Sequence, residues 1–433
     1  MVEKMKNILR KTVFYRMYKK YYAKTANLIN KNPSNWMFIV WITWTNWKTT
    51  TSAILHKIFN DNLWKTLLIN TINIKIWDEE VFNDSKMTSL DAFSLQQLLS
   101  FAKSKWCKYA ILEVSSHWID QYRFEWIEFD MGILTNITAE HLDYHKTFED
   151  YAKTKKKLFL SILANSKSGK YAVFPKDDKI WREWIEDIAI DNILDFGLQT
   201  NATVTAEKID IGITKSMFDL KYLWEKHPVE SNLTWRFNIK NILAAYAAGI
   251  LSWIEIKDII KSVSNFEALP WRIEHVEKNN VQYFIDFAHT PDSLEKSLEF
   301  VNDINKDNWR IITLFGSPWN RDKYKRPQMW EIVEKNSDIF IITDDDPDTE
   351  DRLKIINDIM KNLTKKKWKD YFVIPERSYA IKFLTEITKP WDKVLLAGKG
   401  HENVQLTNFW KVSWNDKRVL LKLLDNPNEK NWN

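Results

Sequence analysis

Residues 41–51 decide the fold, and they read Trp41-Ile42-Thr43-Trp44-Thr45-Asn46-Trp47-Lys48-Thr49-Thr50-Thr51. They follow a short apolar run at 37–40 that predicts a buried strand, and they lead into a predicted helix at 50–59. A strand, a loop and Lys-Thr-Thr at a helix start are typical of a phosphate-binding loop. Main-chain N–H groups and the helix N-terminus hold the phosphates there, the lysine reaches the terminal ones and the threonine binds Mg²⁺. We therefore expect a nucleotide at this position.

The alternation of short apolar strands with helical lengths continues along the chain. Further strands are predicted at 109–114, 131–134, 283–287, 310–315, 339–343 and 393–397. This pattern predicts an α/β protein with largely parallel sheets. We expect an N-terminal arm at 1–35, a central P-loop-type domain at 36–269 and a C-terminal Rossmann-like domain at 270–433, because a new strand-and-helix series begins after Leu269-Pro270.

Composition excludes several classes of protein. The chain has 433 residues, a single cysteine (Cys107) and no apolar run of the ~18 residues that a membrane span needs. A disulfide scaffold is therefore excluded, no cleavable signal peptide is visible, and we expect a cytoplasmic protein. The net charge is only +5, which does not indicate a nucleic-acid-binding protein.

The arm is the one strongly basic segment. Residues 1–35 hold nine Lys or Arg against the single acid Glu3, with apolar and aromatic residues at spacings that predict one amphipathic helix. Two interpretations stay open: an accessory helix packed on the protein, and a helix attached to an anionic membrane surface.

Tryptophan and glycine are present in abnormal numbers, 23 and 8 respectively. A chain of this length ordinarily has about 30 glycines. The phosphate loop works only with glycine, because the backbone must approach the phosphates closely and some residues need positive φ. Our hypothesis is that the gene uses UGA as a glycine codon, so that many residues written as tryptophan are glycine in the natural protein.

Reading Trp41, Trp44 and Trp47 as glycine gives G-I-T-G-T-N-G-K-T-T-T, which resembles the nucleotide loop of the Mur ligase family. Strings that resemble the same family follow in order at 113–123, 136–145, 151–159, 237–241, 269–272, 286–291, 321–327 and 398–402. They are most similar to the MurE-type members, which add the third amino acid to the muramoyl peptide of peptidoglycan precursors. Tryptophan stands where this family has glycine at Trp41, Trp44, Trp47, Trp118, Trp235, Trp271, Trp319, Trp330 and Trp391.

The resemblance implies an amide ligase that uses ATP and two Mg²⁺ ions to form an acyl phosphate. It implies catalytic roles for Lys48, Lys155, His141 and Glu113, with metal contacts from Thr49, Glu113, His141 and Lys155, the last as a carbamate formed with CO₂. The residues alone do not distinguish Lys155 from Lys153, Lys156 and Lys157, and such a run usually forms a solvated basic helix face. The resemblance further implies that ATP contacts Thr45, Asn46, Lys48, Thr49, Thr50, Asn241, Arg272 and Asp286.

The same resemblance places the substrates. The muramoyl-peptide acceptor is expected at Thr88, Ser89, Ser115, Gln121 and Arg123, and the incoming amino acid at Arg321, Asp346, Asp348, Gly398 and Glu402. The chain departs from the family at Asp345-Asp346-Pro347-Asp348, where diaminopimelate-adding relatives have D-N-P-R. Because Asp348 would repel a distal carboxylate, we expect a basic amino acid such as lysine.

A second departure is the N-terminus. Relatives have a complete domain for the uridine nucleotide before the phosphate loop, and only about 35 residues precede it here. Three alternatives therefore stay open: the acceptor is held mainly by its peptide, a partner chain supplies the missing surface, or the basic arm brings the enzyme to a lipid-linked precursor. The leading hypothesis is a monomeric Mur ligase of peptidoglycan precursor synthesis that acts on small molecules. The alternatives are a related ligase for another carboxylate, such as a folylpolyglutamate-type enzyme, and a non-catalytic binding module if the loop tryptophans are real.

Overall fold

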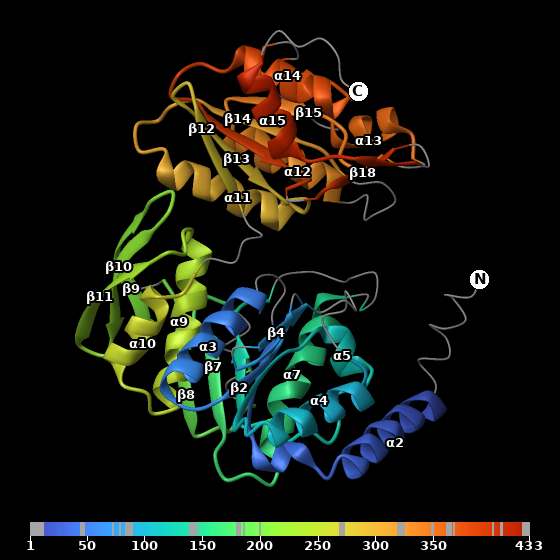
Figure 1. Cartoon of the computed structure of the whole chain (residues 1–433), viewed down its shortest axis with the longest axis vertical. Helices are drawn as coiled ribbons and strands as arrows, with labels where there is room; N and C mark the ends of the chain where they lie inside the picture. Colours follow the sequence, from blue (N-terminus) through green and yellow to red (C-terminus); the bar gives the residue numbers. More distant parts are fainter. Residues whose placement is uncertain are drawn as a thin grey trace. The chain divides into compact units, whose positions relative to one another are not determined.

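Two compact units make up the chain: the first comprises Met1–Asp210 and Thr214–Ala268, and the second comprises Leu269–Asn433 together with the short segment Ile211–Ile213. The computed structural model describes residues 13–43, 48–71, 73–77, 79–82, 90–137, 145, 147–178, 183–184, 187–198, 201–267, 273–317, 325–347, 350–360, 366, 369–400, 402–407 and 410–426. Each unit contains helices and a mainly parallel sheet (Figure 1). The expected α/β fold class is therefore confirmed.

An eleven-stranded sheet is the centre of the first unit, in the order β11-β10-β9-β8-β7-β6-β1-β5-β2-β3-β4. Its strands are β1 Phe38–Thr43, β2 Thr66–Ile69, β3 Asn73–Ile76, β4 Glu79–Phe82, β5 Tyr109–Glu113, β6 Met131–Leu134, β7 Tyr171–Pro175, β8 Asn192–Phe196, β9 Val204–Ile211, β10 Ser216–Tyr222 and β11 Glu225–Ser231. Neighbouring strands are parallel from β2 through β5, β1, β6, β7 and β8 to β9. The pairs β2/β3, β3/β4 and β10/β11 are antiparallel.

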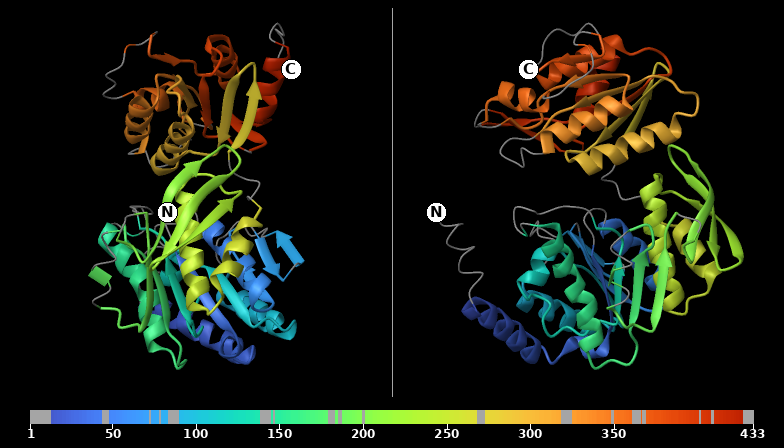
Figure 2. Two further views of the ribbon diagram at one scale, coloured as in Figure 1. Left: turned by 90° about the vertical axis from the view of Figure 1, so that its left-hand side faces the viewer. Right: turned by 180° about the vertical axis from the view of Figure 1, so that it is seen from behind.

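Helices cover both faces of this sheet, as the views in Figures 1 and 2 show. They are α2 Val13–Ile29, η1 Pro33–Trp36, α3 Lys48–Asn62, α4 Ala92–Ser104, α5 Ser116–Asp120, α7 Phe148–Ala164, α9 Arg236–Leu251 and α10 Ile256–Ser264. Residues of α4, α5 and α7 share a buried core with Ile39 and Trp41 of β1, while α3, α9 and α10 pack on one another. Alternate residues of a strand point to opposite faces, so β1 is covered on both sides.

The second unit has its own sheet and core. Six strands stand in the order β12-β13-β17-β14-β15-β16, and all neighbours except β12/β13 are parallel. The elements are β12 Glu274–Lys278, β13 Val281–Asp286, α11 Pro291–Ile304, β14 Ile311–Phe315, α12 Lys325–Asn336, β15 Ile339–Ile342, α13 Arg352–Ile359, β16 Tyr371–Val373, α14 Arg377–Ile387, β17 Lys393–Ala397, β18 Val404–Thr407, β19 Trp410–Ser413 and α15 Asp416–Asp425. Strands β18 and β19 form a separate antiparallel pair.

Strand order explains where a ligand can bind in this second sheet. Strand β17 is inserted between β13 and β14, although the chain reaches it last. In open α/β sheets the crevice beside such a reversal, at the carboxyl ends of the strands, is where ligands bind. Asp286, Asp344 and Gly398 all lie at this edge, because each ends or follows one of these strands.

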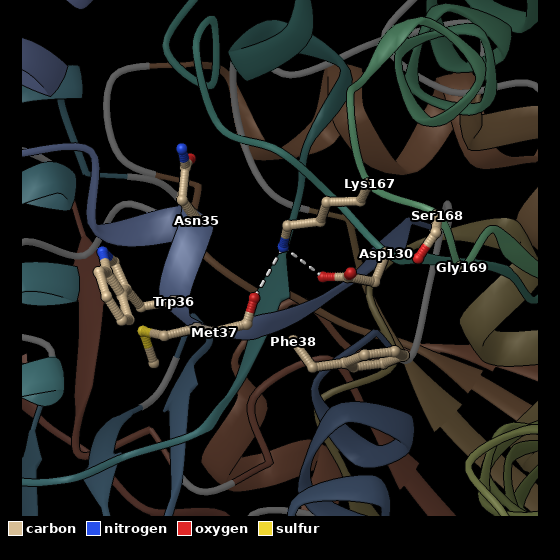
Figure 3. A pocket seen from close by; sticks show the side chains of 8 residues that line it. All are labelled: Asn35, Trp36, Met37, Phe38, Asp130, Lys167, Ser168 and Gly169. Atoms are coloured by element: carbon tan, nitrogen blue, oxygen red, sulfur yellow. Dashed lines mark hydrogen bonds and ion pairs between the residues drawn. The ribbon is translucent and has the colours of Figure 1, made fainter.

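A pocket of about 330 Å³ lies in the first unit, at the amino ends of its strands β1, β6 and β7 (Figure 3). Asp130 accepts a hydrogen bond from Ile39 N–H (2.7 Å) and pairs with the Lys167 ammonium (2.6 Å), which also donates to the Met37 carbonyl (2.7 Å). Burial raises the pKa of Asp130. These contacts bind the starts of β1, β6 and β7 together, so we assign them a structural role.

Candidate active site

Three side chains meet at the carboxyl ends of β1, β5 and β2. Glu113 ends β5 and is 2% exposed. Its carboxylate accepts hydrogen bonds from the Thr49 hydroxyl (3.1 Å), from the Thr71 N–H (3.0 Å) and from the Thr71 hydroxyl (2.8 Å). Thr49 lies in the first turn of α3, directly after the phosphate-loop segment. The sequence-predicted pair Thr49 and Glu113 is thus brought together, and Thr71 is a member that sequence reasoning missed.

Lys155 lies in a second group, on the buried face of α7. It is 0% exposed, and its ammonium lies 4.4 Å from the centre of the Tyr151 ring. The His145 ring lies 5.3 Å from the same ring, and its Nε2 is 3.0 Å from the Ser116 hydroxyl at the start of α5. Burial, with His117 nearby, lowers the pKa of His145. His145 was not predicted as a site residue, although it ends the 136–145 string.

Helix α7 begins cleanly because Thr147 is its N-cap. The Thr147 hydroxyl accepts from the Asp150 N–H at 3.1 Å, and Glu149 and Asp150 place negative charge in the first turn, where the helix dipole favours it. The apolar residues of this helix are buried, and Lys155 lies on the same buried face of the helix. The Lys153 and Lys157 side chains are exposed instead, so the basic run has a buried member and solvated ones.

The other described residues of the expected nucleotide site make contacts within the protein. The Asn241 side chain accepts from the Thr51 hydroxyl (3.1 Å) and donates to the Asn238 side chain (3.1 Å). Thr50 is buried in α3. In the second unit, the Asp286 carboxylate accepts from the Phe287 N–H (2.8 Å) and from the Ser297 hydroxyl. Asn241 and Asp286 therefore position backbone and helices.

The acceptor-side residues at α5 are also described in part. Ser115 immediately precedes this helix, and the side-chain Oε1 of Gln121 accepts hydrogen bonds from Nε and Nη2 of Arg123 at 3.0 and 2.7 Å. The Lys48 side chain lies outside the described part of the structure. The same holds for these expected site residues: Thr45, Asn46, Thr88, Ser89, His141, Arg272, Arg321 and Asp348.

Acidic side chains gather around Lys399 at the carboxyl edge of the second sheet. The buried Lys399 ammonium donates to the carboxylates of Asp346 (2.8 Å) and Glu402 (2.6 Å). Although burial opposes the charged form, these hydrogen bonds raise the pKa of Lys399. Asp345, Asp346 and Glu402 bring carboxylate oxygens within 4.8 Å of one another. The Lys399 ammonium compensates part of this negative charge. The expected residues Asp346, Gly398 and Glu402 are thus brought together.

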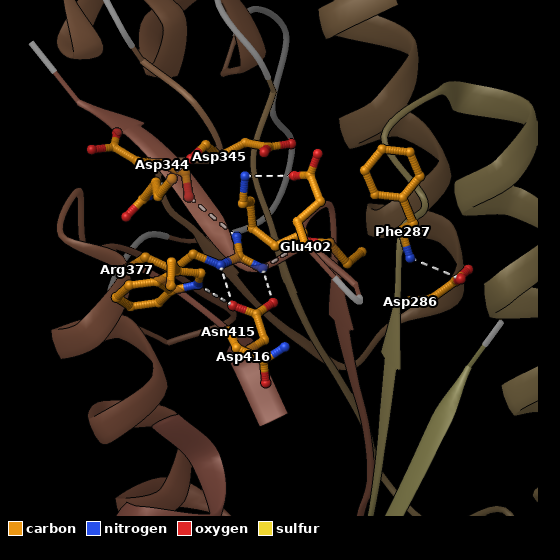
Figure 4. Close-up of polar contacts among 12 residues, drawn as sticks. Asp286, Phe287, Asp344, Asp345, Arg377, Glu402, Asn415 and Asp416 are labelled. Carbon is orange, nitrogen blue, oxygen red and sulfur yellow. Dashed lines mark hydrogen bonds and ion pairs between the residues drawn. The ribbon is translucent and has the colours of Figure 1, made fainter. Parts of the chain in front are cut away.

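Arg377 supports this edge from within the core (Figure 4). It is fully buried with Asp416, which it contacts through Nε at 2.9 Å and through an NH₂ group at 2.6 Å. It also donates to the carbonyls of Asp344 (3.1 Å) and Ala397 (3.0 Å). Those carbonyls directly precede Asp345 and Gly398, so one guanidinium fixes both loops that carry the acidic cluster. Sequence reasoning missed Arg377, because its partners are distant in the chain.

Comparison with known proteins places this geometry in a family. Residues 42–249 match the Mur ligase middle domain, and residues 271–400 match the Mur ligase glutamate ligase domain. The chain is 35% identical over 396 residues to UDP-N-acetylmuramoyl-L-alanyl-D-glutamate–2,6-diaminopimelate ligase 1 of Clostridium acetobutylicum, which covers 91% of this chain and 79% of that protein.

Two solved structures are similar as well. A UDP-N-acetylmuramoyl-L-alanyl-D-glutamate–2,6-diaminopimelate ligase superposes with a TM-score of 0.66 at 27% identity, over 91% of this chain and 79% of that one. The MurF ligase of Thermotoga maritima in complex with ADP gives a TM-score of 0.64 at 16% identity, over 93% and 83%. The second comparison concerns the fold alone.

Proposed function

The chain belongs to the Mur ligase family, and from this premise we propose that it is an ATP-dependent amide ligase that extends a muramoyl-peptide precursor of peptidoglycan. ATP phosphorylates the acceptor carboxylate, the amine of the incoming amino acid attacks the acyl phosphate, and ADP and phosphate leave. We expect a monomer that acts in the cytoplasm. The observation that carries the proposal is the contact of Glu113 with Thr49 at the end of the phosphate-loop segment.

The oxygen donors of Thr49 and Glu113 are of the kind that Mg²⁺ prefers, so the residues present fit this ion. We propose that Thr49 holds one Mg²⁺ ion and that Glu113 and His141 hold a second; when bound, these ions would neutralise charge on the phosphate oxygens. Lys48 at the start of α3 would contact the terminal phosphates, and Thr71 would keep the Glu113 carboxylate in place. Asn241, Arg272 and Asp286 are proposed on the nucleotide side, where Asn241 and Asp286 act by fixing the elements around it.

Lys155 is proposed to react with CO₂ to form a carbamate. Its burial beside Tyr151 supports this, because an ammonium is costly to bury and the neutral amine is the form that attacks CO₂. The product is an anion with two oxygens, which would add a further ligand for a cation at this site.

We propose further that the incoming amino acid is basic. Asp346 and Glu402 make the expected site acidic, and Asp348 adds a third carboxylate where diaminopimelate-adding relatives have arginine. Phosphate release from ATP should be measured for protein made with glycine at the phosphate-loop tryptophans, with a panel of muramoyl-dipeptide acceptors and amino acids. We expect lysine to be used at least tenfold better than diaminopimelate, and equal use of the two would refute this specificity. Absence of phosphate release with every pair would refute the ligase itself.

We also propose that the natural polypeptide carries glycine at many of its tryptophan positions. The backbone supports this, because six tryptophans in the described part of the chain have positive φ: Trp77, Trp106, Trp126, Trp235, Trp253 and Trp391. Residues 389–392 form a β-turn with Pro390 at its second position and Trp391 at its third. The Asp392 N–H donates to the Lys389 carbonyl at 3.1 Å across this turn. A type II turn of this kind requires positive φ at that residue and selects glycine.

Two helix ends carry the same signature. After α4, Trp106 has φ 67°, its N–H donates to the Lys103 carbonyl and the Cys107 N–H donates to the Ala102 carbonyl. This is the Schellman arrangement, whose left-handed residue is usually glycine. Trp253 repeats it after α9 with φ 62°. Trp235, with φ 84° and ψ 138°, occupies a region that suits glycine best.

Peptide mass spectrometry of the native protein tests the glycine proposal. Each exchange lowers the peptide mass by about that of an indolylmethyl group. Peptides with intact tryptophan at positions 44 and 47 would refute it. ATP binding should then be compared between protein made with glycine at these positions and protein made with the sequence as written, and we expect binding in the first only.

A further inference from the structure

Helix α2 presents an apolar face to solvent. Its inner face packs on the protein through buried Ala23, Ala26 and Asn27, and the Tyr22 hydroxyl lies 3.3 Å from the Asp91 carboxylate that caps α4. On the outer face, the most exposed large apolar side chains are Phe14 and Tyr21, at 84% and 72%. A helix that packs on a globular protein ordinarily buries its large apolar residues. Their exposure here indicates that this face of α2 is an interaction surface.

The outer face is a continuous stripe. At 3.6 residues per turn, Phe14, Met17, Tyr21 and Leu28 fall within an arc of about 60° around the helix axis. All four are more than half exposed. Tyr18 and Ile29 widen the stripe on one side and are exposed too. These six residues define the α2 stripe.

A row of cations borders the other side of the α2 stripe. Arg16, Lys20 and Lys24 follow one another at intervals of four residues, and α2 contains no acidic residue. Lys20 pairs with Glu125 at 3.1 Å, and Lys24, one turn further along the helix, is exposed. Lys20 therefore lies at the border where the helix meets the protein, with its long side chain beside the stripe.

We propose that α2 docks the chain on an anionic lipid bilayer, with the α2 stripe in the apolar boundary and Arg16, Lys20 and Lys24 at the head groups. An apolar face beside a basic border is the arrangement of helices that lie in the membrane interface, where long cationic side chains reach the phosphates. Among the described residues, the structure has no helix of the length and apolarity needed to cross a membrane. A second copy packed antiparallel on this face would bring its identical basic row beside that of the first, and the like charges disfavour this mode of self-association.

Vesicle sedimentation of the full chain tests the proposal. Vesicles of phosphatidylcholine with one third phosphatidylglycerol are compared with vesicles of phosphatidylcholine alone. We expect binding to the anionic vesicles to exceed binding to the neutral ones about tenfold and to fall as salt rises. The variant Phe14→Ser/Met17→Ser/Tyr21→Ser should lose at least 90% of the binding. The matched control Leu160→Ser/Met217→Ser/Leu223→Ser removes three exposed apolar residues elsewhere in the first unit and should bind normally.

A charge variant completes the test. Arg16→Gln/Lys24→Gln should weaken binding to anionic vesicles and leave the weak binding to neutral ones unchanged. Equal binding to both vesicle types, or normal binding by the stripe variant, would overturn the proposal. A soluble dimer in sedimentation velocity that the stripe variant abolishes would also overturn it, because the occupant would then be a second copy. All variants should retain the circular dichroism spectrum of the parent, since the changed side chains are exposed.

Discussion

Lys155 is the residue whose chemistry distinguishes the proposed site from an ordinary buried helix face. Its neighbours in sequence, Lys153 and Lys157, are exposed, so burial singles out Lys155 from a run that the sequence leaves ambiguous. We expect Lys155→Ala to lower the rate of phosphate release about 100-fold, since an anionic ligand near the transferred phosphate is lost. Lys157→Ala is the matched control and should keep the parental rate.

NMR spectroscopy of protein incubated with ¹³C-labelled bicarbonate tests the carbamate of Lys155 independently of activity. A ¹³C carbamate signal should form with the parent protein and be absent from Lys155→Arg. Full ligase activity of Lys155→Ala, with or without bicarbonate, would remove the assignment.

Asp345 is a titrating group inside the second unit. Burial raises its pKa to about 7, against the opposing effect of Arg377 and Lys399, while the ordinary value in an unfolded chain is 3.8. Between these values the folded protein holds more protons than the unfolded one, so stability falls as pH rises from about 4 to 7. The slope contributed by one proton is at most about 1.4 kcal/mol per pH unit.

Denaturant unfolding between pH 4 and 7 checks the effect of Asp345. We expect Asp345→Asn to flatten the pH dependence of the free energy of unfolding. The control Asp307→Asn changes an exposed carboxylate in the same unit and should leave the slope as it is. A slope unchanged in Asp345→Asn would contradict the expectation.

At the scale of elements, Arg377 connects the ends of β15 and β17 with the start of α15. Removing one member of a fully buried ion pair leaves a charge without compensation, which costs about 3–5 kcal/mol. We therefore expect Arg377→Met to lower the free energy of unfolding by this amount. The double variant Arg377→Met/Asp416→Leu should recover a large part of it, and simple additivity of the two single losses would show that the side chains do not act as a pair.

The end of helix α9 gives a test of backbone strain. In protein made with tryptophan, Trp253→Gly should raise the free energy of unfolding by about 1 kcal/mol, because a residue with a Cβ is strained in the left-handed region. Trp253→Ala should give less, since the Cβ remains. Trp410 lies exposed in strand β19, and Trp410→Gly should be destabilising or neutral. The same gain at both positions would exclude a backbone cause.

Several elements could be predicted from the sequence because their signal is local. The apolar run at 37–40 became β1, and the amphipathic arm became α2 over Val13–Ile29. The three strands β9, β10 and β11 were not predicted, because half-exposed strands mix apolar and charged residues. In the site, Thr49 and Glu113 could be singled out in advance. The Thr71 and Arg377 contacts could not, since they join residues that only the tertiary fold brings together.

The whole molecule consists of two units with separate sheets and cores. The described hydrophobic core cluster of the second unit consists of residues between Val276 and Leu424, and its six-stranded sheet lies within residues 274–397. We expect a fragment of residues 273–426 to fold alone, with mixed helix and strand content by circular dichroism and one cooperative thermal transition. A fragment that unfolds without cooperativity would show that this core is insufficient by itself.

The tryptophans with positive φ have a consequence for other proteins of the same organism. A codon's meaning is ordinarily read from messenger and transfer RNA. Under the proposed reassignment it would also leave a trace in dihedral angles, because glycine adopts the positive φ of position 391, in the turn after Pro390, without strain. If the proposed reassignment operates genome-wide, other proteins of the same organism should show tryptophan crowded into the positive half of the Ramachandran map. A survey of tryptophan φ angles in those proteins would then reveal the codon reassignment without any analysis of RNA.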